Sequence, residues 1–237
     1  MPLLTEAGSF KAVRDAFTWD VPDRINMGWQ VCDRHAEEIP TRTGLIVAEA
    51  DGGQRDYSWS ELAQLSNQMA NVLEAKGLKR GDRFGILLSQ CVEAAISHVA
   101  AWKMGAISIP LFALFGEEAL AFRLKDSGAK MIITEDIHLA KIEAIRDQLP
   151  DLELVLLIDG KDGADSVDFW RAMDQAKDAF QIVDTAATDP SYIIYTSGTT
   201  GNPKGALQGH RSLIGHTPAI EFFHDFMPQP GDLMWTP

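Results

Sequence analysis

From residue 84 onward, short and almost wholly apolar runs alternate with longer segments in which apolar residues recur every three or four positions. The short runs predict strands at 84–88, 107–112, 131–134, 154–158 and 192–196. The longer segments predict helices at 92–103, 117–126, 138–148 and 168–177. Apolar strands separated by single helices are typical of parallel βαβ units, so the pattern predicts an α/β fold with the sheet buried between helical layers.

The segment before residue 84 is organised differently. Residues 1–40 mix aromatic and charged side chains without a clean period, and we interpret them as a helical lead-in that wraps onto a larger body. Strand-like segments at 44–48 and 55–57 flank a turn sequence, Asp51-Gly52-Gly53, and predict a hairpin. Ser58 and Glu61 then match a capping box at the start of a helix that ends at Gly77.

The charge of the chain excludes some partners. The 237 residues include 21 Lys and Arg against 34 Asp and Glu, a net charge of −13, which argues against binding nucleic acid or an anionic membrane by bulk electrostatics. The surplus is concentrated at 135–189, with 14 acidic and 5 basic residues, whereas 190–237 holds three acidic and two basic residues. An anionic ligand would therefore be held in the last segment by local dipoles rather than by net charge.

Compartment and membrane topology follow from the cysteines and the apolar runs. Two cysteines, Cys32 and Cys91, do not make a disulfide framework, and the N-terminus lacks the basic and apolar regions of a signal peptide. No uncharged run reaches the roughly 18 apolar residues that a membrane-spanning helix needs. We therefore expect a soluble, cytoplasmic protein without a membrane span.

One segment has a composition suited to binding phosphate. The apolar strand at 192–196 runs directly into a stretch rich in hydroxyls and glycines with a single lysine near its end: Thr196-Ser197-Gly198-Thr199-Thr200-Gly201-Asn202-Pro203-Lys204-Gly205. Glycines let backbone N–H groups turn toward an anion, hydroxyls add donors, and the lysine adds a positive charge. The stretch follows a strand, and the carboxyl end of a sheet strand is where α/β proteins usually bind ligands.

Two other interpretations of this stretch fit less well. The common nucleotide P-loop needs Gly immediately before its Lys and a hydroxyl after it, whereas here Pro203 precedes Lys204 and Gly205 follows, so a kinase or GTPase is disfavoured. Clusters of Gly, Ser and Thr are also common in surface turns between two strands, but this stretch is longer and more specific than such turns tend to be.

The stretch resembles the signature loop of the adenylate-forming (AMP-dependent synthetase/ligase) superfamily, T-S-G-T-T-G-x-P-K-G, at every position. His210 stands where members of this superfamily commonly have a histidine after the loop, and Gly81-Asp82-Arg83 precedes a strand as in many members. The segments at 109–130 and 231–237 are similar to the short- and medium-chain acyl-CoA synthetases. The resemblance implies that the chain is the N-terminal portion of a large AMP-binding domain. Residues 1–187 would form a first α/β subdomain and 188–237 would begin a second one, so the fold would be incomplete.

The same resemblance bears on the catalytic residue. Members of the superfamily carry a catalytic lysine on a small C-terminal domain, and in a protein of this kind that lysine would lie beyond Pro237, the last residue of the sequence. The small domain would therefore be absent from this chain. We accordingly predict phosphate-binding residues here and assign no catalytic residue.

The resemblance also implies a reaction and its participants. A carboxylic acid would attack the α-phosphate of ATP to give an acyl-adenylate and pyrophosphate, and the thiol of CoA would then displace AMP. The loop would hold the β- and γ-phosphates with Mg²⁺, through the hydroxyls of Thr196, Ser197, Thr199 and Thr200, the backbone at Gly198, Gly201 and Gly205, and the charge of Lys204. Fatty acid metabolism is the expected context, and homo-oligomerisation is left open. The fragment alone is expected to be inactive; the alternative is a stand-alone nucleotide- or acyl-binding module or an inactive remnant.

Several further side chains are candidates for a role near the loop. His210 is assigned either to a phosphate or acyl pocket or to packing, and Trp235 either to an acyl pocket or, the interpretation we favour, to the core. His98, in an apolar helix, is expected to be a hydrogen-bonded core histidine. His210, His216 and His224 lie six and eight residues apart, which does not suit ligands on one helix face, so no metal site is predicted from side chains of this chain.

Overall fold

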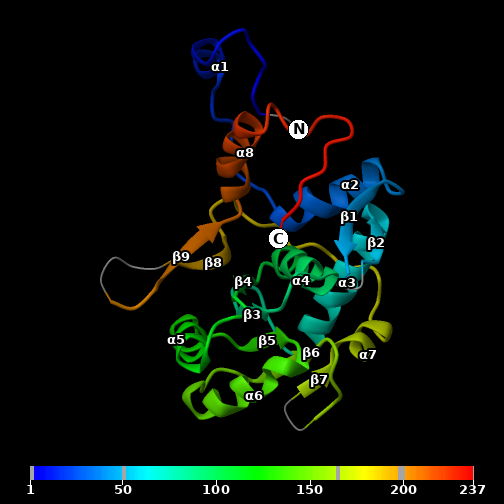
Figure 1. Ribbon diagram of the computed structural model, residues 1–237, viewed down its shortest axis with the longest axis vertical. Coiled ribbons are helices and arrows are strands. Elements are labelled where there is room, and N and C mark those ends of the chain that lie inside the picture. The colour runs from blue at the N-terminus through cyan, green and yellow to red at the C-terminus, as the bar shows by residue number, and fades with distance from the viewer. Residues whose placement is uncertain (1–2, 50–51, 164–165, 197–200, 237) are drawn as a thin grey trace.

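A seven-stranded sheet forms the centre of the molecule (Figure 1). The computed structural model describes residues 3–49, 52–163, 166–196 and 201–236. In spatial order the strands are β7 (Ser166–Asp168), β6 (Leu154–Leu157), β5 (Met131–Thr134), β3 (Arg83–Leu87), β4 (Ile107–Pro110), β8 (Pro190–Thr196) and β9 (Lys204–Gly209). Every neighbouring pair is parallel except β8 and β9, which are antiparallel. The predicted α/β fold is confirmed, with an antiparallel hairpin added at one edge.

Helices cover both faces of the sheet and create two cores. The first face carries α3 (Trp59–Ala75), α4 (Val92–Lys103) and α7 (Phe169–Asp174), whose apolar side chains surround Phe84 of β3. The second face carries α5 (Glu117–Ser127) and α6 (Asp136–Ile145), which pack around Ile109 and Ile132. Strands between two apolar layers are buried on both faces, which is why their sequences read as continuous apolar runs.

Most of the N-terminal segment packs onto this body as expected, but its first helix lies away from the sheet, where Phe10 packs edge-on against Phe222 (Figure 1). It contains α1 (Phe10–Ala16), a π-helical turn (Trp29–Asp33), α2 (Arg34–Glu38) and the hairpin of β1 (Thr43–Ala48) and β2 (Gln54–Ser58). The capping box is present, because Ser58 Oγ accepts from the Glu61 N–H and Glu61 accepts from the Ser58 N–H. In the turn Gly52 has φ = 87°, while Asp51 lies outside the described residues. Near the start of the chain, the backbone N–H groups of Leu3 and Leu4 donate to the buried carboxylate of Glu221 on α8 (Ser212–Phe223).

Several predicted boundaries are wrong. The predicted helix at 168–177 is shorter, because its first residue ends the short strand β7 and the helix stops at Asp174. The predicted helix at 138–148 begins at Asp136 and ends in a 3₁₀ turn, Arg146–Gln148. Strands β7 and β9 and helix α8 were not predicted. No helix in the described ranges is long and apolar enough to cross a membrane.

A buried lysine joins the N-terminal segment to the helical layer. Lys103, at the end of α4, has no exposed side-chain surface and forms an ion pair with Asp33, with 2.8 Å between Nζ and Oδ1. The ammonium group also donates to Ser66 Oγ at 2.8 Å and to Asn67 Oδ1 at 2.7 Å, both on α3. Burial lowers the pKa of Lys103, and the nearby carboxylate opposes that shift. Each of the three donors of the ammonium thus has a partner, as a buried charge requires.

Candidate functional site

The hairpin of β8 and β9 holds both ends of the predicted phosphate loop. Its register pairs Thr196 with Lys204 and Tyr195 with Gly205, so the first hydroxyl and the lysine of the loop stand opposite each other across two strands. Both Thr196 and Lys204 are exposed. The other predicted loop residues Ser197, Gly198, Thr199 and Thr200 lie outside the described residues. The loop is thus a connection between two strands, at the carboxyl end of β8.

Glycine is favoured for different structural reasons at the two loop glycines that the structure describes. Gly201 has φ = 93°, a left-handed conformation that favours glycine, and a Cβ there would meet nothing within 4 Å. Gly205 is not in that region, but a Cβ would come within 3.0 Å of Ile193 Cγ2 and 3.2 Å of Tyr195 Cζ. The sequence suggested that Gly205 gives a ligand access to the backbone. The structure adds a packing reason, since Gly205 makes room for two side chains of β8.

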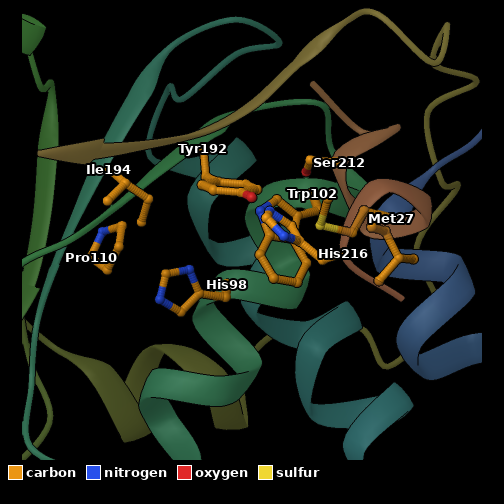
Figure 2. A pocket seen from close by; sticks show the side chains of 9 residues that line it. Met27, His98, Trp102, Pro110, Tyr192, Ile194, Ser212 and His216 are labelled. Carbon is orange, nitrogen blue, oxygen red and sulfur yellow. The ribbon is translucent and has the colours of Figure 1, made fainter. Parts of the chain in front are cut away.

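A cavity of about 270 Å³ adjoins the hairpin (Figure 2). His98 and Trp102 from α4 and Tyr192 and Ile194 from β8 contribute to its walls, as Figure 2 shows. The remaining lining residues are Met27, Pro110, Ser212, Leu213 and His216. Because side chains of a strand alternate between its faces, Tyr192, Ile194 and Thr196 share one face of β8. The apolar cavity and the first hydroxyl of the loop therefore lie along the same face of one strand.

The cavity has few polar groups, and most of them are engaged. Trp102 Nε1 donates to Ser108 Oγ at 3.2 Å, and that hydroxyl lies 3.0 Å from His98 Nδ1. Burial lowers the pKa of His98 to about 4, so the imidazole is neutral near pH 7 and Nδ1 accepts the serine proton. The expectation of a hydrogen-bonded histidine is confirmed, although His98 also faces the cavity. Ser212 Oγ is different: it is buried without a hydrogen-bond partner among the described residues.

His210 is fully buried and anchors the end of the hairpin. Its Nδ1 accepts from the backbone N–H of Met27 at 3.0 Å, and its backbone N–H donates to the carbonyl of Asp189 at 3.0 Å. Burial lowers the pKa of His210 to about 4, so Nε2 carries the single proton and finds no partner within the part of the chain that the structure describes. These contacts support the packing interpretation. Contact of His210 with phosphate or an acyl group stays a prediction.

Trp235 is 79% exposed, so its interpretation as a core residue is wrong. It belongs to the segment after α8, whose last residues are exposed, and it does not line the cavity. Its assignment to an acyl pocket stays a prediction. Within the described ranges, no group of three or more His, Cys, Asp or Glu side chains is placed to hold a metal ion.

The expected position of the catalytic lysine is not tested by the structure. Pro237, beyond which the resemblance puts that lysine, lies outside the described residues, which end at Thr236. The assignment of catalysis to a part of the protein after Pro237 therefore stays a prediction. The site described here is a candidate for binding phosphate and an acyl group.

The molecule is an α/β domain with a candidate phosphate-binding site at the carboxyl end of β8. The chain belongs to the AMP-binding enzyme family, whose model matches residues 32–237. It is 30% identical to an acetyl-coenzyme A synthetase of Escherichia coli (strain K12) over 96% of this chain, and 32% identical to that of Sodalis glossinidius over 92%. The resemblance drawn from the loop sequence is thereby confirmed.

Solved structures agree with this membership. An acyl-CoA synthetase of Brucella canis superposes with a TM-score of 0.76 over 86% of this chain, at 26% identity. An anthranilate CoA ligase in complex with anthranoyl-AMP has the same fold, with a TM-score of 0.74 over 83% of this chain, at 24% identity. The chain spans 37% of the length of the E. coli relative and 37% of each of these two structures.

Proposed function

We propose that the protein containing this chain activates a carboxylic acid with ATP and transfers the acyl group to CoA. In the first step a carboxylate oxygen attacks the α-phosphorus of ATP, forming the acyl–phosphate bond as the bond to pyrophosphate breaks. In the second step the sulfur of CoA attacks the acyl carbon, the thiol proton passes to solvent, and AMP leaves with the former carboxylate oxygen. The names of the similar proteins, acetyl- and acyl-CoA synthetases, support this choice of reaction.

The observation that carries the proposal is the arrangement on β8. Thr196 and Lys204 stand opposite each other at the loop, and the apolar cavity begins two residues earlier on the face that Thr196 shares. A carboxylic acid whose apolar part lies in the cavity would therefore direct its carboxylate along β8 toward phosphates held at the loop. Reactants held in line in this way gain rate from orientation alone.

Residues of the loop would act by binding and electrostatics rather than by proton transfer. The exposed ammonium of Lys204 would neutralise charge that builds on the departing pyrophosphate. Hydroxyls of Thr196, Ser197, Thr199 and Thr200 would donate to phosphate oxygens, and Gly198, Gly201 and Gly205 would let the backbone approach. Because the substrate is already a carboxylate, no base has to remove a proton from it. The first step therefore does not require an acid–base group in this part of the protein.

Magnesium fits this site only together with ATP. Mg²⁺ usually keeps several waters and is bound through one or two carboxylates plus the phosphates of its nucleotide. The described residues offer no carboxylate cluster, and Thr196 is the described hydroxyl at the loop. The ion would supply charge neutralisation on the phosphates, and residues outside the described ranges would complete its coordination.

The cavity supports an acid larger than acetate. The volume of the cavity is about 270 Å³, whereas a water molecule takes up about 30 Å³ in the liquid. The cavity is therefore much larger than the methyl group of acetate needs. Flat side chains of Trp102 and Tyr192, 6.4 Å apart between ring centroids, suit an aromatic or medium-length acyl group. The hydroxyl of Ser212, which has no hydrogen-bond partner among the described residues, offers one polar contact to such a group. A role in fatty acid metabolism, a cytoplasmic location and a homo-oligomeric state belong to the same proposal.

Pyrophosphate exchange tests the reaction. The encoded protein, in its natural full length, is supplied with labelled pyrophosphate, ATP and a series of acids from acetate through hexanoate to benzoate. We expect exchange that depends on the acid and favours hexanoate or benzoate over acetate. Lys204→Ala should lower kcat/KM by about 100-fold, as loss of one group that stabilises transition-state charge does. Lys177→Ala, at an exposed lysine after α7, is the matched control.

The outcomes separate the candidates. Absence of exchange with every acid would contradict the proposal and leave the binding module or inactive remnant. A preference for acetate would keep the reaction and overturn the assignment of the cavity to the acyl group. Equal activity of Lys204→Ala and Lys177→Ala would show that the loop does not hold the leaving group.

A further inference from the structure

Tyr195 lies directly before the loop and faces away from the cavity. With Ile193 it occupies the second face of β8 and packs against the core under α5. Its hydroxyl lies 2.7 Å from Asp126 Oδ2 and 3.2 Å from the carbonyl oxygen of Arg123, both on α5, and it donates its proton to the nearer carboxylate. Burial and the Asp126 carboxylate raise the pKa of Tyr195, so the phenol keeps this proton.

The ring of Tyr195 is enclosed on several sides. Across the hairpin it lies over Gly205, where a Cβ would come within 3.2 Å of its Cζ. The Arg123 guanidinium lies 5.7 Å from its ring centroid, and Phe122 meets it edge-on at 6.4 Å. Arg123 is itself held, since its guanidinium stacks 4.0 Å from the Phe115 ring centroid and donates to the carbonyl of Ala119.

The loop end of the hairpin has little other support. Strand β8 pairs with β4 at a single position, Ser108 with Tyr192, so its last four residues extend beyond the register that joins it to the sheet. Strand β9 is the sheet edge and pairs only with β8 among the described strands. Figure 1 shows this hairpin projecting to one side of α4, above α5. Among the described residues, the hydroxyl of Tyr195 is the side-chain group that hydrogen-bonds the projecting end to a helix.

We propose that Tyr195 is a positioning residue for the phosphate loop, joining its base to Asp126 of α5 so that Thr196 and Lys204 hold the phosphates in a fixed place. This inference rests on the proposed function. Gly205 is part of the same arrangement, because a side chain there would crowd the Tyr195 ring and displace it from its present position. The consequence is that α5, which lies outside the loop and the cavity, contributes to ATP binding.

The test is Tyr195→Phe in the encoded protein, which keeps the ring and removes the hydroxyl. We expect the Kd for ATP with Mg²⁺ to rise by about tenfold, which corresponds to the loss of one hydrogen bond to a charged group. Peptides covering 201–209 should exchange their amide hydrogens about tenfold faster. The Kd for the carboxylic acid and the Tm should change little. Tyr57→Phe, at a buried tyrosine on β2, is the matched control.

Variants at the partner residue separate positioning from a general loss of structure. Asp126→Asn keeps an oxygen that accepts the tyrosine proton, and it should bind ATP nearly as the unmodified protein does. Asp126→Ala should behave as Tyr195→Phe, and combining these two should add no further loss, because both remove the same contact.

Each outcome is decisive. An unchanged Kd for ATP in Tyr195→Phe overturns the proposal. Faster hairpin exchange with an unchanged Kd also overturns it, because Tyr195 would then stabilise the hairpin without positioning the phosphates. An unmodified protein that binds ATP but shows no pyrophosphate exchange removes the proposed function, while the Kd comparison still decides the role of Tyr195. An unmodified protein that binds no ATP overturns both.

Discussion

Strands β3 and β5 at the centre of the sheet are buried almost throughout, whereas β8 and β9 at its edge leave Thr196, Lys204 and Leu207 exposed. The central strands each pair on both sides and lie between two helical layers. The edge hairpin pairs with the sheet at one position and carries the loop. The parallel centre is thus a well-packed support, while the residues that would meet a ligand stand on an edge of the sheet that has few contacts with the rest of it.

Two lysines show the same contrast at the level of single residues. Lys103 is buried with Asp33 and three hydrogen-bond acceptors around its ammonium group, so its charge is neutralised within the fold. Lys204 is exposed at the start of β9, so its charge remains accessible to a ligand. The first should therefore matter for stability and the second for activity.

The largest effect is expected from Lys103→Met in this chain. The substitution leaves the Asp33 carboxylate buried without its cation, which costs about 3–5 kcal/mol, and Tm should fall by roughly 10 °C. Thermal unfolding followed by circular dichroism measures it. Adding Asp33→Asn should restore at least half of the loss, because the buried charge is then gone. If Lys103→Met alone unfolds no earlier than the unmodified chain, the ion pair does not join the N-terminal segment to the body.

A smaller effect concerns pH and the base of the hairpin. In the folded protein the pKa of His210 is about 4, below the ordinary value of about 6.5. Between these two pH values the imidazole binds more protons in the unfolded chain than in the folded one. Its contribution to stability is therefore fully present above about pH 6.5 and is lost as pH falls toward about 4. The variant His210→Asn keeps an acceptor for the Met27 N–H but has no imidazole to protonate. When the pH is lowered from about 7 to 5, its free energy of unfolding should therefore fall by about 1–2 kcal/mol less than that of the unmodified chain.

Urea unfolding at a series of pH values measures this difference. The comparison is between variants, because many carboxylates also contribute to the pH dependence of the whole chain. His224→Asn, at an exposed histidine after α8, is the matched control. Parallel pH curves for His210→Asn and the unmodified chain would refute the assignment of a neutral buried imidazole at this position.

The smallest effect on stability is expected from Lys204→Ala. An exposed lysine at a sheet edge contributes within about 0.5 kcal/mol, so Tm should stay within about 2 °C, in contrast to the large loss of pyrophosphate exchange expected for the same variant. Thermal unfolding of Lys103→Met and Lys204→Ala, measured under the same conditions, tests whether the first charge contributes to stability and the second does not. A fall in Tm as large as that of Lys103→Met would mean that Lys204 serves the fold.

Regular elements in the centre could be predicted because their signals are local. The helix Val92–Lys103 and the strand Met131–Thr134 have the predicted bounds, since both are apolar segments between clear breaks. Strand β9 was missed because Lys204-Gly205-Ala206-Leu207-Gln208-Gly209 has two glycines and no β-branched residue. It is a strand because the loop returns it to β8, which offers free backbone groups.

The candidate site divides in the same way. The loop was predictable, because its glycines, hydroxyls and lysine are consecutive in the sequence. The cavity was not, since His98, Tyr192 and His216 come from three separate elements that only the fold brings together. The prediction that Trp235 belongs to the core was wrong for a related reason. Tryptophan is usually buried, but its burial here depends on what packs against the segment after α8.

Local patterns along the chain were enough to predict the α/β class, the order of the central elements, the phosphate-binding composition of the loop and the family resemblance, because periodicity and a contiguous motif are written in neighbouring residues. Other features emerged with the three-dimensional fold alone: the antiparallel hairpin that sets Thr196 opposite Lys204, the cavity beside it, the buried contacts of His210 and Lys103, and the anchoring of Tyr195 to Asp126. These depend on contacts between residues far apart in the chain, whose partners are fixed by packing rather than by local preference.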